Sequence, residues 1–212
     1  MPIISKQITP FIVSFALFME AVDTTIINTA IPAMSRSLNV HPVDLKIALI
    51  SYLLSLAVFI PISGWVADKF GIKKVFLLAI TFFTLCSVWC GFAHTLPELV
   101  IARTLQGIGG SFMLPVGRLI LVRTFPRHEF VNVMSRVIMV AALGMMLGPL
   151  LGGFITEYVS WHWIFWVNIP VGLFAVLSGL VWLEHVPSKK MPKLDKMGFL
   201  LFDISNNFVY NN

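Results

Sequence analysis

Six long apolar runs, separated by short polar connections, constrain the fold of this chain more than any other feature of its sequence. A helix needs about 20 mostly apolar residues to cross the roughly 30 Å hydrocarbon core of a bilayer. The runs cover residues 8–33, 45–67, 74–94, 97–122, 132–156 and 162–184. Because they are continuously apolar and do not alternate with period two, they favour helices over the strands of a barrel. The sequence therefore predicts an all-α membrane protein with a bundle of six transmembrane helices.

The composition argues against most soluble classes of protein. Only 12% of the residues are charged, whereas soluble domains carry about 25%. The net charge of +5 would suit a nucleic-acid binder, but the basic residues lie in short clusters between the apolar runs, as in cytoplasmic loops. Cys86 and Cys90 share one run without further metal ligands, and no nucleophile–base set or phosphate loop appears. We therefore expect a lipid bilayer as partner, no nucleic acid, no metal or other cofactor, and no enzyme.

Lysine and arginine indicate the orientation of the six spans. Basic residues precede the first span, lie between the second and third and between the fourth and fifth, and follow the sixth: Lys6, Lys69, Lys73, Lys74, Arg123, Arg127, Arg136, Lys189, Lys190, Lys193 and Lys196. The other connections hold only Arg36 and Lys46. The excess of basic residues on the cytoplasmic side predicts a multi-pass protein with its N-terminus inside.

The last part of the chain differs from the rest. We expect the bundle to occupy residues 1–184, and residues 185–212 to form a cytoplasmic segment and the truncated start of a seventh span. "FLLF" begins this span, and "DISNNFVYNN" stops it with residues that are poor helix formers and costly in lipid. The six spans are thus expected to be a partial count, and a fragment, a frameshift and a functional half all fit.

Two carboxylates lie within the first run, in "FMEAVDTTIINTAIPAM". Asp23 precedes Pro32 by nine residues, which places it about 13 Å from the outer end of the helix. An ionised carboxylate there costs at least a few kcal/mol unless it is paired or hydrated, and protonation removes most of that cost. An acid that exchanges its proton as water reaches it is the physical basis of a proton relay. Glu20 shares this face, although loop water or lipid headgroups are an equal alternative for its surroundings.

Arg103 in the fourth run is the expected partner of Asp23 if the first and fourth spans pack together. It follows Pro97 by six residues, about 9 Å from the outer end of a helix of opposite direction, so the two charges reach similar depths. Arginine stays charged and would hold the carboxylate ionised until a ligand or a rearrangement separates them. The alternative is a static ion pair that joins two helices. Gln106 and Gly107 follow on the same helix and are expected to line a cavity.

The stretch "GWVADKFGIKK" connects the second and third runs. Gly64 is expected to let another helix come close. Asp68 ends the second helix and Gly71 makes the turn, after which Lys73 and Lys74 open the third helix. An acid here can bind a helix N-terminus or pair with a base across the bundle, and so latch a cytoplasmic gate. A tight turn with an ordinary basic cluster is equally compatible.

The fifth run contains "GMMLGPLLGG", in which glycines recur four residues apart. Gly144, Gly148 and Gly152 form a small-residue face, with Gly153 next to it, and such a face favours close helix packing. Pro149 removes a backbone hydrogen bond and is expected to kink the helix. The pattern indicates packing strongly and any particular activity only weakly.

Together these segments resemble the N-terminal half of a major facilitator superfamily transporter, closest to the fourteen-span drug:proton antiporter branch. Six stretches carry the resemblance in order from Asp23 to Phe202: "VDTTIINTAIP", "GWVADKFGIKKV", "RTLQGIGG", "GMMLGPLLGG", "WHWIFWVNIPVG" and "LDKMGFLLF". The resemblance implies one half of a major facilitator fold, built as a 3+3 repeat of helices. It also implies a second six-span bundle, a central cavity and alternating access in a bacterial cytoplasmic membrane.

The resemblance also implies roles for single positions. Asp23 would be the acid for proton coupling or cation recognition, and Arg103 would be linked to proton transfer. The loop around Asp68 would form the gate, and the run from Gly144 to Gly153 the antiporter hinge. Ile72 stands where the family usually has arginine, which weakens one arm of the expected latch. Separately, His162 replaces a usual arginine in the sixth span.

The leading hypothesis is therefore proton-coupled efflux of amphipathic organic compounds, in which the substrate is lipophilic and a cation is among the candidates. A uniporter or symporter for a small metabolite is the alternative within transport. A truncated, non-transporting pseudogene product is the alternative outside it. Transport would require the missing C-terminal half or a second copy of the chain.

Overall fold

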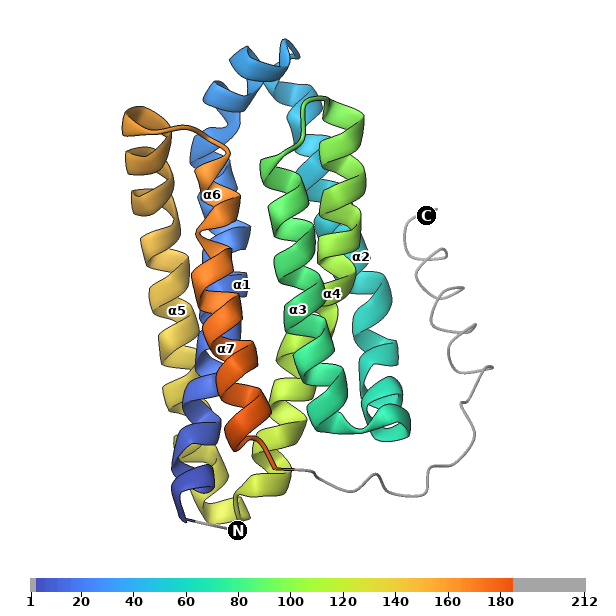
Figure 1. The fold of residues 1–212 in the computed structure, drawn as a ribbon, viewed down its shortest axis with the longest axis vertical. Coiled ribbons are helices and arrows are strands. Elements are labelled where there is room, and N and C mark those ends of the chain that lie inside the picture. The colour runs from blue at the N-terminus through green and yellow to red at the C-terminus, as the bar shows by residue number, and fades with distance from the viewer. Residues whose placement is uncertain (1–2, 185–212) are drawn as a thin grey trace, which may run out of the picture.

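The computed structural model describes residues 3–184, and this part of the chain is almost entirely helical (Figure 1). The helices are α1 (Ile3–Leu38), α2 (Pro42–Phe70), α3 (Ile72–Gly91), α4 (Leu96–Thr124), α5 (Arg127–Tyr158), α6 (Trp163–Trp166) and α7 (Asn168–Trp182). Within the described residues, six segments are long and apolar enough to cross a membrane, and the last of these, Trp163–Trp182, combines α6 and α7. The predicted all-α bundle of six spans is confirmed.

The helices extend beyond the apolar runs because their ends are polar but still helical. α1 continues through Pro10 and Pro32 to Leu38, and α5 continues through Pro149 to Tyr158. α2 and α3 meet at Gly71, whose φ of 96° suits a residue without a side chain. Thr95 caps α4 by accepting a hydrogen bond from the Glu98 backbone nitrogen at 3.4 Å. The expected cytoplasmic segment and seventh span, residues 185–212, lie outside the described residues.

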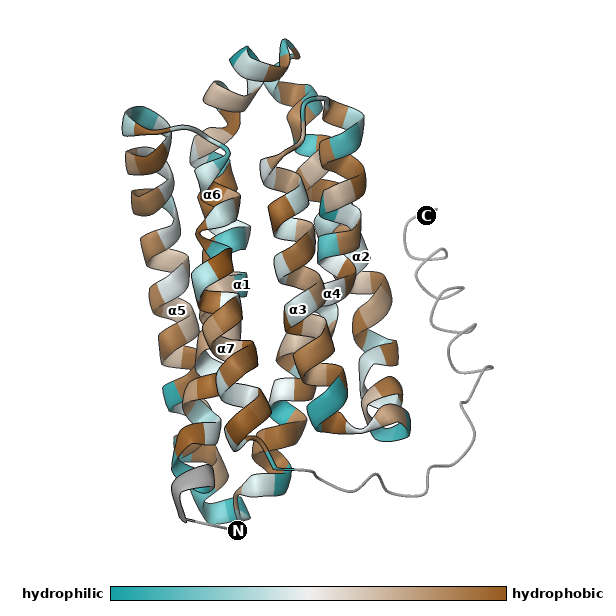
Figure 2. Cartoon of the chain, in the orientation of Figure 1, coloured by the Kyte–Doolittle hydropathy of each residue, from teal (hydrophilic) through white to brown (hydrophobic). Residues whose placement is uncertain are grey.

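The bundle consists of two packed groups of helices. α1 packs along α5, while α2 and α3 both pack on α4, and α7 lies against α1 and α3 (Figure 1). Apolar residues fill the space between them in two clusters, one around Phe76 and Phe83 and the other around Ile26, Ile27 and Phe165. α2 and α5 are the least buried of the six spans. Hydrophobic residues nevertheless cover much of their length, as the colouring in Figure 2 shows.

One end of the bundle carries most of the positive charge of the described residues. The start of α1 contributes Lys6, the α2–α3 junction contributes Lys69, Lys73 and Lys74, and the α4–α5 junction contributes Arg123 and Arg127. We call this the basic end. The opposite end has Arg36 near the end of α1 and Lys46 near the start of α2. This asymmetry is the one on which the predicted orientation rests.

Candidate functional site: a buried charge cluster

A buried ion pair joins α1 to α4 inside the bundle. Asp23 of α1 and Arg103 of α4 are both 0% exposed, and Nη1 of Arg103 donates to Oδ2 of Asp23 at 2.6 Å. The two residues are 80 positions apart in the sequence. Antiparallel helices bring them to the same depth, as the residue counts from Pro32 and Pro97 predicted. A pair removed from water in this way must satisfy its remaining hydrogen-bonding groups within the protein.

Two amide side chains complete the coordination of Asp23. Gln106 donates from Nε2 to Oδ1 of Asp23 at 3.0 Å, and its Oε1 accepts from Nη1 of Arg103 at 2.8 Å. Asn168 of α7 donates from Nδ2 to the same Oδ1 at 2.8 Å. The Asn168 nitrogen also donates to Oγ of Ser87, which in turn donates to the Phe165 carbonyl oxygen. The cluster therefore connects α1, α3, α4 and α7 around a single carboxylate.

Aromatic rings enclose the guanidinium group of Arg103. Its central carbon lies 4.6 Å from the centroid of the Tyr52 ring and 5.5 Å from that of Phe165. Cation–π attraction of this kind strengthens when the groups are desolvated. Among the described residues, Nε and Nη2 of Arg103 have no hydrogen-bond partner. The arginine thus keeps two donors that an acceptor group of a ligand would fit.

Glu20 lies one helical turn before Asp23 on α1 but is half-buried, whereas Asp23 is fully buried. With Thr24 and Asn28 it recurs every four residues, so the three polar side chains share one face of the helix. Glu20 and Thr24 are half-buried and Asn28 is exposed. Polar residues within a span usually face a bundle interior or a water-filled cavity. We call this face the polar stripe of α1.

The residues expected in a gating loop occupy separate environments. Nη2 of Arg123, at the end of α4, donates to Oδ1 of Asp68 at 2.5 Å, so the acid pairs with a base across the bundle. Lys73 donates to the Leu180 carbonyl oxygen at 2.9 Å, and Lys74 is exposed. A Cβ added to Gly64 would have no atom within 4 Å, so no helix of the described chain uses this glycine for close approach. The expected close approach of another helix at Gly64 is thus not made within the described residues.

The glycines of α5 form its contact with α1. A Cβ on Gly144 would lie 2.8 Å from the Phe18 carbonyl oxygen, and one on Gly152 would lie 2.6 Å from the Ile26 carbonyl oxygen. Between them, a Cβ on Gly148 would overlap Thr25. Gly153 has open space, and Pro149 is exposed. Three of the four glycines therefore hold α5 against the segment of α1 that carries Asp23.

Gly107 packs against a helix. A Cβ at this position would lie 2.5 Å from the Tyr52 carbonyl oxygen and 2.8 Å from Cβ of Ser55. It thereby lets α4 approach α2 and brings Tyr52 to Arg103. Gln106, the other residue expected to line a cavity, lies in the buried cluster.

Sequence reasoning missed four members of the cluster: Tyr52, Ser87, Phe165 and Asn168. Asn168 had a usable signal, since an asparagine in an apolar span is costly unless it has a partner. Ser87 gave a weaker signal of the same kind. Tyr52 and Phe165 are ordinary residues of apolar runs, and only the folded positions of their rings beside Arg103 assign them to the site.

Comparison with known proteins gives the family. Residues 13–207 match the model of the Major Facilitator Superfamily. The chain is similar to the "Putative multidrug resistance protein MdtD" of Shigella flexneri serotype 5b (strain 8401), with 44% identity over 194 residues. It is also similar to the protein of that name from Enterobacter sp. (strain 638), with 46% identity over 193 residues. These matches cover 92% and 90% of this chain but 41% and 40% of the relatives. The chain thus spans less than half the length of these curated relatives.

A solved structure supports the fold. The bundle is similar to the crystal structure of a bacterial homolog of the human lysosomal transporter Spinster in an inward-facing and unoccupied conformation, with a TM-score of 0.65. The match covers 97% of this chain and 49% of that one. The sequences are 18% identical, so the likeness concerns the fold alone.

Proposed function

Because the chain belongs to the Major Facilitator Superfamily, a family of membrane transporters, we propose that it forms the N-terminal half of a proton-coupled efflux transporter. Asp23 would be the acid that binds and releases the proton. The substrates would be amphipathic organic compounds, and the names of the relatives support multidrug export. The observation that carries the proposal is the buried contact between Asp23 and Arg103.

This contact suits a carboxylate that exchanges partners. While Arg103 holds Asp23, the permanent charge of the arginine occupies the carboxylate within the protein. A movement of α4 relative to α1 would remove the arginine, and a proton or a cationic group of a substrate would then compete for the same oxygens. Competition for one carboxylate couples the exit of a cation to the entry of a proton. Gln106 and Asn168 would keep the carboxylate oriented while the partners exchange.

The polar stripe of α1 supports a water-filled cavity beside this site. Asn28 is exposed within an apolar span, and such a residue is costly against lipid. A second six-helix bundle, from a C-terminal half or a second copy of this chain, would enclose water against the stripe. Glu20 would then be a second protonatable group on the path to Asp23.

Two further contacts would control the alternating access. The Asp68–Arg123 pair would tie α2 to α4 at the basic end, which we propose faces the cytoplasm. The Gly144–Gly152 face would act as the hinge at which α5 moves with α1. The close packing at these glycines would leave little room for water between α5 and α1, which would limit proton leak along that contact.

Proton release on ligand binding tests the proposal. The 212-residue chain, alone and as a covalently linked tandem of two copies, is mixed with tetraphenylphosphonium in a weakly buffered detergent solution. We expect the tandem to release protons, Asp23→Asn to abolish the release, and Asp44→Asn, a change of an exposed acid on α2, to leave it intact. Proton uptake on binding would instead favour a symporter. Absence of any proton exchange in both forms of the wild-type protein would overturn the proposal.

A further inference from the structure

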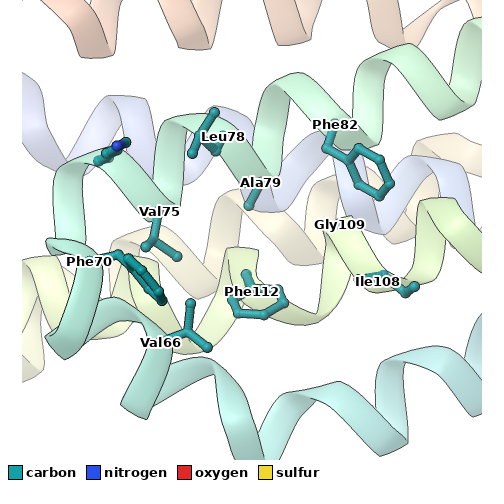
Figure 3. A pocket seen from close by; sticks show the side chains of 10 residues that line it. Val66, Phe70, Val75, Leu78, Ala79, Phe82, Ile108, Gly109 and Phe112 are labelled. Carbon is teal, nitrogen blue, oxygen red and sulfur yellow. The ribbon is translucent and has the colours of Figure 1, made fainter.

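An apolar pocket of about 360 Å³ lies near the basic end of the bundle, in the cleft between α2 and α3 (Figure 3). Val66 and Phe70 of α2 form one wall, and Leu78 and Phe82 of α3 form the other. Phe112 of α4 lies between them. Nothing in the buried charge cluster contributes to this lining, so the pocket is a separate feature of the fold.

The pocket follows from the way in which three helices pack. α2 and α3 both pack extensively on α4 but little on each other. Gly109 of α4 brings α3 in closely, because a Cβ there would lie 2.9 Å from the Phe83 backbone nitrogen. The close approach leaves α4 as a floor and the two flanking helices as walls. Phe70, Leu78 and Phe82 of the lining are exposed in the described chain, so we expect acyl chains to reach the pocket in a membrane.

The lining of the pocket is charged at one end and apolar along the rest. On α3, the lining residues Lys74, Leu78 and Phe82 recur every four residues and so share one face. From Lys74 to Phe82 the helix rises about 12 Å, from the polar start of α3 into the hydrocarbon region. Lys74 is the charged residue of the lining and is exposed. The exposed Lys69 lies close by, with its Nζ 5.2 Å from the centroid of the Phe70 ring.

We propose that this pocket binds an anionic phospholipid, with one acyl chain along Leu78 and Phe82 and the phosphate at Lys74. A cationic head above a narrow apolar cleft is complementary to such a lipid in both charge and polarity. A transported substrate fits less well, because the apolar part of the lining has no polar side chain to orient it. The lipid would brace α2 against α3, which otherwise share few contacts besides the turn at Gly71.

Lipid retention by the purified chain tests this proposal. Delipidated protein in detergent is supplied with dioleoyl phosphatidylglycerol or dioleoyl phosphatidylcholine, and the bound lipid is counted by native mass spectrometry. We expect about a fivefold preference for the anionic lipid, the size expected of one lysine near a membrane surface. Lys74→Gln should abolish the preference. Ala79→Leu, which fills the pocket from α3, should lower the retention of both lipids.

Control variants outside the pocket test whether the change in lipid binding is specific to the pocket. Lys46→Gln removes one charge at the other end of α2, and Ala57→Leu adds the same bulk at an exposed site; both should behave as wild type. Leu78→Gln, at an exposed position, serves as a second pocket variant if Ala79→Leu does not fold. Unchanged preference in Lys74→Gln, or unchanged retention in both pocket variants, would overturn the proposal. Lipid retention does not depend on proton exchange at the buried ion pair, so a failure of the transport proposal would leave this result unaffected.

Discussion

The side-chain amide of Asn168 donates a hydrogen bond of 2.8 Å to Oδ1 of Asp23. The two residues are 145 positions apart, and the contact fixes α7 to α1 at the buried ion pair. The same nitrogen reaches Ser87 of α3, so one side chain ties three helices together. Asn168 is therefore a positioning residue for the carboxylate, in addition to the arginine that neutralises it.

Replacement of Asn168 by alanine should destabilise the bundle. Hydrogen bonds to charged groups contribute about 1.5–3 kcal/mol, and Oδ1 of Asp23 would keep only the bond from Gln106. We expect a loss of this size in the free energy of unfolding, measured by denaturation in mixed micelles. Asn28→Ala, on the exposed part of the polar stripe, should change it by less than about 0.5 kcal/mol. An equal loss of unfolding free energy in the two variants would mean that the Asn168 contact contributes no more to stability than an exposed asparagine.

The Asp23–Arg103 pair should show strong energetic coupling. Removing one partner of a buried pair costs about 3–5 kcal/mol, because the other charge is left uncompensated. Arg103→Met and Asp23→Asn should therefore each be strongly destabilising, whereas the double variant should cost much less than their sum. A double-mutant cycle on unfolding free energies measures this coupling. Additive effects would show that the two charges are satisfied independently.

The sequence predicted the charged part of the site better than its aromatic part. The apolar runs predicted the spans, and counting residues from Pro32 and Pro97 predicted that Asp23 and Arg103 lie at similar depths, because helical rise converts directly into depth. Their contact also requires the first and fourth helices to pack together, which the residue counts left open. The aromatic walls gave no such signal, since Tyr52 and Phe165 resemble any other apolar position of a span. Their place depends on which helix faces are in contact, which is a property of the packed bundle.

The glycines also show which sequence patterns predict close helix packing and which do not. The four-residue spacing in α5 predicted close packing, and Gly144 and Gly152 provide it. Gly64 was expected to do the same but has open space within the described chain. A single glycine does not reveal whether a partner helix lies opposite. A periodic row of them does, because a row is useful only when a second helix runs along it.

Substitution of Gly152 should separate α5 from α1. A Cβ would lie 2.6 Å from the Ile26 carbonyl oxygen, and a backbone atom cannot rotate away. We expect Gly152→Ala to destabilise the protein by about 1–3 kcal/mol through overpacking. Gly153→Ala is the matched control on the next residue, where the space is open, and it should be neutral or gain up to about 1 kcal/mol from helix propensity. The free energy of unfolding of both variants is measured, and equal values would contradict overpacking at Gly152.

The stability of the loop between α5 and α6 should depend on pH through His162. Its ring stacks on Trp161 with centroids 3.8 Å apart, and its Nδ1 lies 2.8 Å from Oγ of Ser160. Burial, and to a lesser degree the charge of nearby His94, lower the pKa of His162 below its ordinary value near 6.5. The unfolded chain therefore takes up the proton first, so the folded state loses stability as the pH falls through about 6.5.

Thermal melts between about pH 8 and pH 5 measure this loss, and His162→Gln should reduce it. His94→Gln should raise the pKa of His162, because it removes a repelling charge, and NMR titration of the ring would detect the change. The shift should remain smaller than the effect of burial, which is the larger cause. A His162 pKa at or above its ordinary value in the wild-type protein would contradict the packed position of the ring against Trp161.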